Sequence, residues 1–194
     1  MAKVALGCSV HSGWAVVVAV AEPAGGSEPV IVGRYRATLV PDELPRMTYH
    51  AAAELPVGDG EALIEQVTAA AEAGARSELA MAINGVTDGD VELCAVLGEE
   101  RSLPSLERIL ASHALLHTAE GQLYRQVLVE AAQDLGLRAV LMPPKAVGAQ
   151  VMATWGWSED RQATWLTGEG KALGPPWQKD HKQAVLAAMV ALRT

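Results

Sequence analysis

The order of apolar segments along this 194-residue chain limits its fold more than any other feature of the sequence. Three of these segments follow one another closely at the start of the chain, at residues 3–10, 14–21 and 30–40. A turn at residues 11–13 and a loop containing two prolines and two glycines separate them. Three strands in such close succession predict an antiparallel meander.

Beyond the meander, helical and strand patterns alternate. Apolar periodicity predicts helices at 61–75 and 78–86, the second of which can continue the first past Gly74. The segments that follow are a strand at 91–97, a long helix at 103–137, a strand at 138–142, and helices at 145–155, within 158–177 and at 179–192. Consecutive strand–helix–strand units require right-handed parallel crossovers. The sequence therefore predicts a single α/β domain over residues 1–194, with a mixed five-stranded sheet that has residues 3–10 in its middle.

One segment between the meander and the first helix has no clear periodicity. Residues 41–60 contain three prolines and predict a loop packed on the edge of the sheet. Within it, residues 46–50 (Arg-Met-Thr-Tyr-His) are more polar and aromatic than a linker requires.

The long helix carries polar side chains where its apolar face is expected. At about 100° per residue, His113, His117, Glu120 and Tyr124 fall in the middle of the arc formed by its leucines and valines. An unpaired buried carboxylate is costly, so these groups need partners. We expect His113, His117 and Glu120 to be largely buried and hydrogen-bonded, with one imidazole within reach of Glu120.

Three interpretations of this cluster remain open. It is a satisfied core network in which His117 and Tyr124 both bond to Glu120, or a catalytic group that faces a cleft, with Tyr124 as a binding residue and Asp180 as a further participant. The spacing of His113, His117 and Glu120 is also that of a helical metal site. The acid does not lie between the two histidines, so the pattern is not that of the helical metalloproteases.

The charge of the chain is unevenly distributed. The net charge is −8, yet residues 143–194 carry six basic and four acidic side chains. An acidic protein binds polyanions poorly without a local basic surface. We therefore expect any nucleic acid to bind the C-terminal quarter, where four of the five tryptophans lie after residue 150. These tryptophans could stack on bases, but in a chain without phenylalanine we expect them to fill the core.

The cysteines and the apolar runs bear on location. Cys8 and Cys94 are the only cysteines, and each falls in a predicted buried strand. Two unpaired thiols and no basic segment before the apolar run at 14–21 favour a reducing, cytoplasmic setting. That run is too short to span a bilayer, so we expect no membrane contact. A homodimer is compatible with the composition.

Two segments of the chain resemble a known family. Residues 4–18 (VALGCSVHSGWAVVV) are similar to an apolar run followed by Gly-Ile-Asp-Pro-Gly, a few polar residues and Gly-Trp/Tyr. Residues 180–190 (DHKQAVLAAMV) are similar to a last helix that reads Asp-x-x-Asp-Ala-Leu-Ala-Leu-Ala. Both patterns are typical of Holliday-junction resolvases of the RuvC type, in the ribonuclease-H-like superfamily. The resemblance implies the sheet order 3-2-1-4-5, with helices on both faces.

The resemblance also implies a site for two Mg²⁺ ions, held by acids on the first strand, the fourth strand and the last helix. Asp180 matches the first acid of the last helix, and Glu99 or Glu100 would supply the acid that follows the fourth strand. Cys8 is expected where the first-strand Asp belongs, and Gln183 replaces the second helix Asp. A thiol is a poor Mg²⁺ ligand. The implied protein is nuclease-like and associated with nucleic acid, with an eroded metal site, doubtful Mg²⁺ binding and weak or no cleavage.

Further candidates lie near these motifs. Ser9 and Ser12 could line an anion site in the first hairpin, although a simple hairpin turn is the favoured explanation. His181 and Lys182 could contact a ligand beside Asp180, or Asp180 could be the N-cap of its helix. Two other functions remain open: an enzyme of another class that uses the His113, His117 and Glu120 cluster on a small substrate, and a non-catalytic subunit that binds a protein partner.

Overall fold

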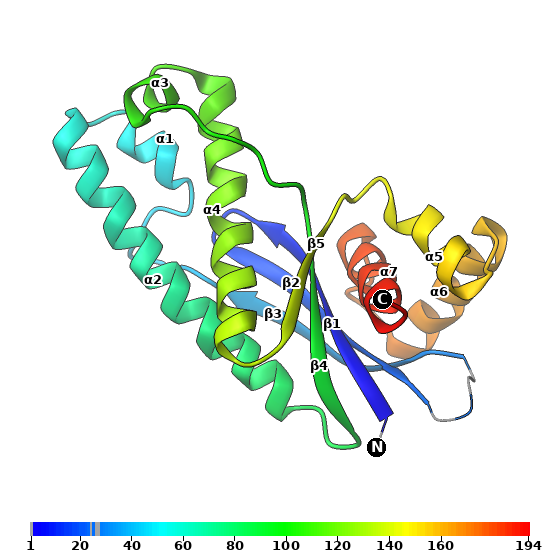
Figure 1. Ribbon diagram of the computed structural model, residues 1–194. Coiled ribbons are helices and arrows are strands. Elements are labelled where there is room, and N and C mark those ends of the chain that lie inside the picture. Colours follow the sequence, from blue (N-terminus) through cyan, green and yellow to red (C-terminus); the bar gives the residue numbers. More distant parts are fainter. Residues whose placement is uncertain (1, 24, 26–27) are drawn as a thin grey trace.

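The computed structural model describes residues 2–23, 25 and 28–194, and its centre is a five-stranded sheet in the order β3-β2-β1-β4-β5 (Figure 1). Strand β1 (Ala2–His11) lies in the middle, antiparallel to β2 (Trp14–Glu22) and parallel to β4 (Gly89–Leu97). The outer strands are β3 (Val30–Thr38), antiparallel to β2, and β5 (Arg138–Met142), parallel to β4. The predicted meander, the parallel crossovers and the strand order are confirmed.

Helices cover both faces of this sheet (Figure 1). Helices α2 (Val57–Asn84) and α4 (His113–Asp134) pack on one face, and α7 (Lys179–Leu192) packs on the other. Side chains of the central strand alternate between two cores, with Leu6 on the α2 and α4 side and Ala5 on the α7 side. Because both faces are covered, the central strands are apolar at nearly every position.

The two helical segments predicted at 61–75 and 78–86 form one helix, α2, which continues past Gly74. A β-carbon at Gly74 would lie 2.4 Å from the carbonyl oxygen of Leu39, so glycine lets the helix approach the chain that leaves β3. The segment at 41–60, predicted as a loop, contains the short helix α1 (Thr48–Ala52).

The prediction of one helix over residues 103–137 is wrong, because the chain forms two helices there. Helix α3 (Leu106–Leu110) ends at Ala111, and Ser112 has extended backbone angles (φ −134°, ψ 111°) before α4 begins. A helical wheel cannot be continued through an extended residue. The break therefore changes the directions of the α3 side chains relative to those of α4, and it leaves the angles between side chains within α4 unchanged. Gly136, with φ 80°, follows α4 in the left-handed conformation expected after a helix.

The C-terminal part consists of α5 (Val147–Trp155), α6 (Glu159–Leu173) and α7, which has the predicted bounds. The indole N–H groups of Trp155 and Trp177 donate to the carbonyl oxygens of Met189 and Leu166, at 2.8 and 2.9 Å. These rings belong to the core, as expected. Among the helices of the described residues, none has the length and apolar character needed to cross a bilayer.

Candidate functional site

The carboxyl ends of the three parallel strands meet at one edge of the sheet (Figure 1). Strands β1, β4 and β5 run in the same direction and end at His11, Leu97 and Met142. Helix α7 begins at this edge on one face, and α1 with the first turns of α4 lies there on the other (Figure 1). Open α/β sheets bind ligands at such an edge. Both of its faces are therefore candidate sites.

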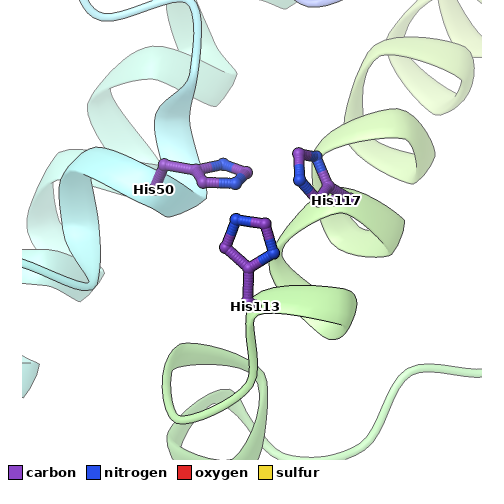
Figure 2. Close-up of side chains that lie close together, drawn as sticks. All are labelled: His50, His113 and His117. Carbon is purple, nitrogen blue, oxygen red and sulfur yellow. The ribbon is translucent and has the colours of Figure 1, made fainter.

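Three histidines from two helices face one another on the α4 side (Figure 2). One ring nitrogen each of His50, His113 and His117 lies within 4.8 Å of the others. His50 is partly buried, whereas His113 and His117 are exposed. The expected burial of His113 and His117 is wrong, because both lie in the first two turns of α4, before the residues of this helix that pack in the core of the sheet, which begin at Leu123.

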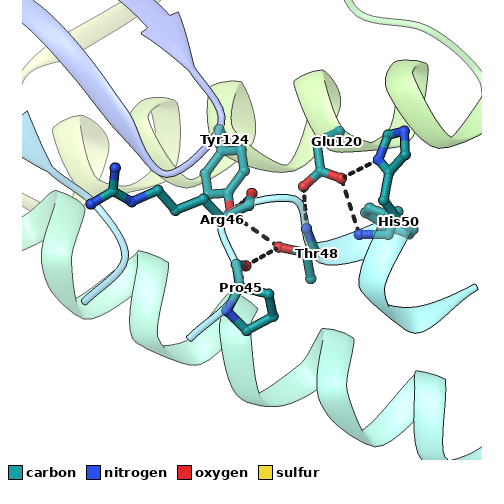
Figure 3. A network of polar contacts seen from close by, with 7 residues as sticks. Pro45, Arg46, Thr48, His50, Glu120 and Tyr124 are labelled. Carbon is teal, nitrogen blue, oxygen red and sulfur yellow. Dashed lines mark hydrogen bonds and ion pairs between the residues drawn. The ribbon is translucent and has the colours of Figure 1, made fainter. Parts of the chain in front are cut away.

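Glu120 lies next to these histidines and is only 2% exposed. Its Oε1 accepts the backbone N–H of Thr48 at 2.6 Å, and its Oε2 accepts that of Tyr49 at 3.0 Å (Figure 3). The same Oε2 lies 3.2 Å from Nδ1 of His50. A carboxylate at the N-terminus of a helix is favourable, so Glu120 anchors α1. The expected contact between Glu120 and an imidazole is present, but the imidazole is that of His50.

Tyr124 extends this network and is fully buried. Its hydroxyl donates to the carbonyl oxygen of Arg46 at 2.7 Å and lies 3.0 Å from the Thr48 hydroxyl (Figure 3). Burial raises the pKa of Tyr124 to about 12, so the phenol stays protonated. The binding role expected for Tyr124 is replaced by a positioning role, because its only polar atom holds the loop before α1.

On the α7 face, a single carboxylate lies beside two residues of β1. Asp180 Oδ2 is 3.2 Å from His11 Nε2, and the Ser9 hydroxyl donates to Asp180 Oδ1 at 3.5 Å. The His11 ring stacks on Trp14 with 4.1 Å between ring centres. Asp180 is the second residue of α7, whose N-cap is Gln178, so the expectation that Asp180 is the N-cap is wrong.

The β1 residue that faces α7 is Ser9 and not Cys8. Cys8 points into the core on the α2 and α4 side, with its Sγ 3.7 Å from that of Cys94. Gly7 faces α7 closely, since a β-carbon there would lie 1.9 Å from the carbonyl oxygen of Ala184. The Gly-Ile-Asp of the resolvase pattern therefore matches Gly7-Cys8-Ser9. The assignment of the first acid to Cys8 is corrected by one residue, and its replacement is a neutral serine.

The residues present here do not fit a two-Mg²⁺ site. Such a site needs several carboxylates within reach of both ions, whereas Ser9 and Gln183 are neutral. Among the described residues, Asp180 is the carboxylate that contacts Ser9, and it is also paired with His11. Glu99 and Glu100, which follow β4, are exposed.

The loops after β4 and β5 form a pocket of about 470 Å³ with the side of α4. Arg101, Arg125 and Lys145 line it, together with a single acidic side chain, that of Glu99. Arg125 is half-buried, and its Nε is buried without a hydrogen-bond partner among the described residues. Burial, aided by the charge of Arg101, lowers the pKa of Arg125. His117 lies on the wall of the same pocket.

The remaining candidates lie around the first turn of α7 and the first hairpin. His181 is buried, and its Nδ1 accepts the backbone N–H of Gln178 at 3.3 Å in a capping box. Burial is the main cause that lowers the pKa of His181. Lys182 and Ser12 are both partly buried. Of these residues, His181 has the clearest structural function, because it closes the start of α7.

Sequence reasoning missed His50, Arg101 and Arg125 as site residues. His50 lies 70 positions from Glu120 in the chain, and only the tertiary fold brings them together. The polar and aromatic character of residues 46–50 was the one signal that pointed to this segment. The basic pocket joins three separate segments, so no local pattern marks it.

Comparison with known proteins relates the chain to resolvases at the level of fold. No family model and no curated protein sequence matches it. The RuvC structure of Thermus thermophilus matches with a TM-score of 0.53 and 12% identity, covering 96% of this chain and 92% of that chain. RuvC of the same organism in complex with a Holliday junction substrate matches with a TM-score of 0.56 and 13% identity, covering 97% and 91%. The chain therefore has the ribonuclease-H-like fold of the RuvC resolvases.

Proposed function

We propose that this protein is a resolvase-like nucleic-acid-binding protein. It contacts the phosphates of the nucleic acid at the carboxyl edge of its sheet, and it cleaves the nucleic acid weakly or not at all. The basic pocket beside β4 and β5 carries the proposal. The fold of the protein also supports the proposal, since a structure with the same fold is a complex with a Holliday junction substrate.

The charges in this pocket favour a bound anion. Two guanidinium groups, of Arg101 and Arg125, lie close enough for one to affect the pKa of the other, and Lys145 adds a third cation. Phosphate oxygens accept several hydrogen bonds from arginine in a fixed geometry. A phosphate would thus offset the repulsion between the two arginines and supply a partner for the buried Nε of Arg125.

The proposed nucleic-acid-binding surface differs in part from the C-terminal quarter, which the charge distribution of the sequence indicates as the binding region. Two of the basic side chains of that quarter are already paired, Arg161 with Glu28 and Arg193 with Glu22. Lys145 belongs to this quarter and lines the pocket, while Lys182 lies in the first turn of α7. The proposed surface therefore combines the start of the C-terminal quarter with α4 and the loop after β4.

The donor set on the α7 face supports the proposal of weak or absent cleavage. Ser9 and Gln183 provide no charge for a divalent ion, and Asp180 is paired with His11. Glu120, the acid that a different enzyme class would use, is buried and bonded to two backbone N–H groups. These observations support binding over catalysis.

Fluorescence anisotropy with a labelled four-way junction and a labelled duplex tests the proposal. The double variant Arg101→Ala, Lys145→Ala changes two exposed side chains. In a plot of the logarithm of the binding constant against the logarithm of the salt concentration, the slope should become less steep by roughly two. Lys171→Ala, an exposed lysine on α6, is the matched control and should bind like the natural protein. Absence of binding at low salt, or equal loss in the control, would overturn the proposal.

A further inference from the structure

We propose that His50, His113 and His117 form a binding site for a Zn²⁺-class ion, with a fourth position open to water. The proposal does not depend on nucleic-acid binding, although His117 also lies on the wall of the basic pocket. The three imidazoles come from α1 and from the first two turns of α4, and they converge on one point (Figure 2). Each offers a ring nitrogen within 4.8 Å of the other two.

Glu120 prepares His50 to act as a ligand. The carboxylate is fixed by the N–H groups of Thr48 and Tyr49, and it lies 3.2 Å from His50 Nδ1 (Figure 3). A hydrogen bond there places the proton on Nδ1 and leaves Nε2 with a free lone pair. Carboxylates commonly orient metal-binding histidines in this way.

The free nitrogen of His50 is the second observation that points to a ligand. His50 Nε2 is shielded from solvent and has no hydrogen-bond partner in the part of the chain that is described. Buried polar atoms nearly always have a partner, so an orphaned one needs an explanation. The ring of His50 lies 4.5 Å from that of His117, centre to centre. A bound cation between the rings would supply the missing partner.

The donor set selects the kind of ion. Three neutral imidazoles suit Zn²⁺, Ni²⁺, Co²⁺ or Cu²⁺, whereas Mg²⁺ prefers oxygen ligands. A tetrahedral Zn²⁺ with bonds of about 2.0–2.1 Å brings its ligand atoms to about 3.4 Å from one another. His113 and His117 are exposed and can rotate to close the remaining distance. Their exposure also leaves room for water as the fourth ligand.

The site would add a further link between α1 and α4, which already contact each other through Glu120, Tyr124 and the packing of Tyr49 against Leu116 and Ala119. Helix α1 follows the loop that Tyr124 holds at Arg46, and α4 carries the other two histidines. An ion that binds only the folded protein stabilises it. Zn²⁺ should therefore raise the melting temperature of the protein.

Titration calorimetry of chelator-treated full-length protein with Zn²⁺ alone tests the site, and Co²⁺ absorption reports its geometry. We expect one equivalent of Zn²⁺, Co²⁺ bands typical of tetrahedral coordination, and no effect of millimolar Mg²⁺. Glu120→Gln should weaken Zn²⁺ binding by roughly 10- to 100-fold. The raised melting temperature should be absent when Zn²⁺ is removed.

The decisive control keeps the composition of the chain unchanged. The double variant His117→Thr, Thr167→His moves one imidazole to an exposed position on α6, so the number of histidines stays the same. Both positions are exposed, so the variant should fold even where Glu120→Gln does not. Loss of stoichiometric Zn²⁺ binding in this variant supports the site. Equal Zn²⁺ affinity in the two proteins, or no binding by the natural protein, overturns it.

Discussion

Two carboxylates lie at the same edge of the sheet, Glu120 on the α4 face and Asp180 on the α7 face, and their surroundings differ. The Glu120 side chain is 3% exposed and accepts two backbone N–H groups, while that of Asp180 is 26% exposed and contacts Ser9 and His11. Glu120 therefore organises local structure. The comparison teaches that a carboxylate beside a cluster of histidines can anchor a helix, and that the residues proposed here to bind a ligand are the histidines around it.

The two faces of this edge also differ in how they are held together. The α4 face depends on a polar network among Glu120, Thr48 and Tyr124, whereas α7 packs so closely on β1 that only glycine fits at position 7. The predictions below separate these two kinds of stabilisation, beginning with the largest effect.

Gly7→Ala should destabilise the protein by about 3 kcal/mol, because the added methyl group would overlap the backbone of α7 and neither element can move freely. Chemical denaturation measures the change in the free energy of unfolding. Gly168→Ala is the matched control: it lies in α6 with open space around it, and it should be neutral or slightly stabilising. Equal effects of the two substitutions would show that α7 is not packed against β1 as described.

Glu120→Ala should destabilise the protein by roughly 1–3 kcal/mol, because it leaves the buried N–H of Thr48 and the partly buried N–H of Tyr49 without an acceptor. Asp180→Ala, on the other face, should have an effect of less than about 1 kcal/mol, because that carboxylate is partly exposed. Thermal melts of both variants at the same pH test the contrast. Similar melting temperatures would remove the distinction between the anchor and the accessible acid.

Tyr124→Phe should destabilise the protein by about 1 kcal/mol, since it removes the hydrogen bond to the Arg46 carbonyl and leaves the rest of the ring in place. The loop before α1 should then become more mobile, which hydrogen exchange of residues 46–52 would detect. Unchanged exchange there would mean that Glu120 alone holds the loop.

His181→Gln, at the start of α7, should make the free energy of unfolding of the protein less dependent on pH. Burial, together with the nearby charge of Arg34, lowers the pKa of His181 in the folded protein, although Asp180 opposes this. The unfolded chain therefore binds more protons as the pH falls below the ordinary histidine value of about 6.5, and stability is lost in that range. Glutamine can still accept the hydrogen bond of the capping box, but it does not titrate.

Denaturation curves at pH 7 and pH 5 test this prediction. The natural protein should lose stability over this range, and the variant should lose less. An identical loss in both proteins would assign the effect to other groups.

The sequence was sufficient to predict the sheet, but it did not reveal most of the candidate site. Three close strands and two crossover units determine the order 3-2-1-4-5, because connection rules leave few alternatives. The bounds of α7 followed from apolar periodicity and were correct. These features depend on local patterns.

The errors arose where tertiary structure decides the outcome. His113 and His117 lie in the first two turns of α4, before the residues that reach the core of the sheet, and helical periodicity does not show where along a helix the core ends. The pairing of His50 with Glu120 depends on contacts across 70 residues. The position of the first acid in the resolvase pattern was assigned to Cys8, one residue away from Ser9. Because successive residues of a strand lie on opposite faces of the sheet, this error of one position placed the predicted site in the core.

The most direct test of the central claim is a combined binding and cleavage assay on a four-way junction in millimolar Mg²⁺ or Mn²⁺. The account predicts that the natural protein binds the junction and leaves it intact, and that Asp180→Asn behaves in the same way. Metal-dependent cleavage that is abolished by Asp180→Asn would contradict it, because the α7 face would then retain a working nuclease site.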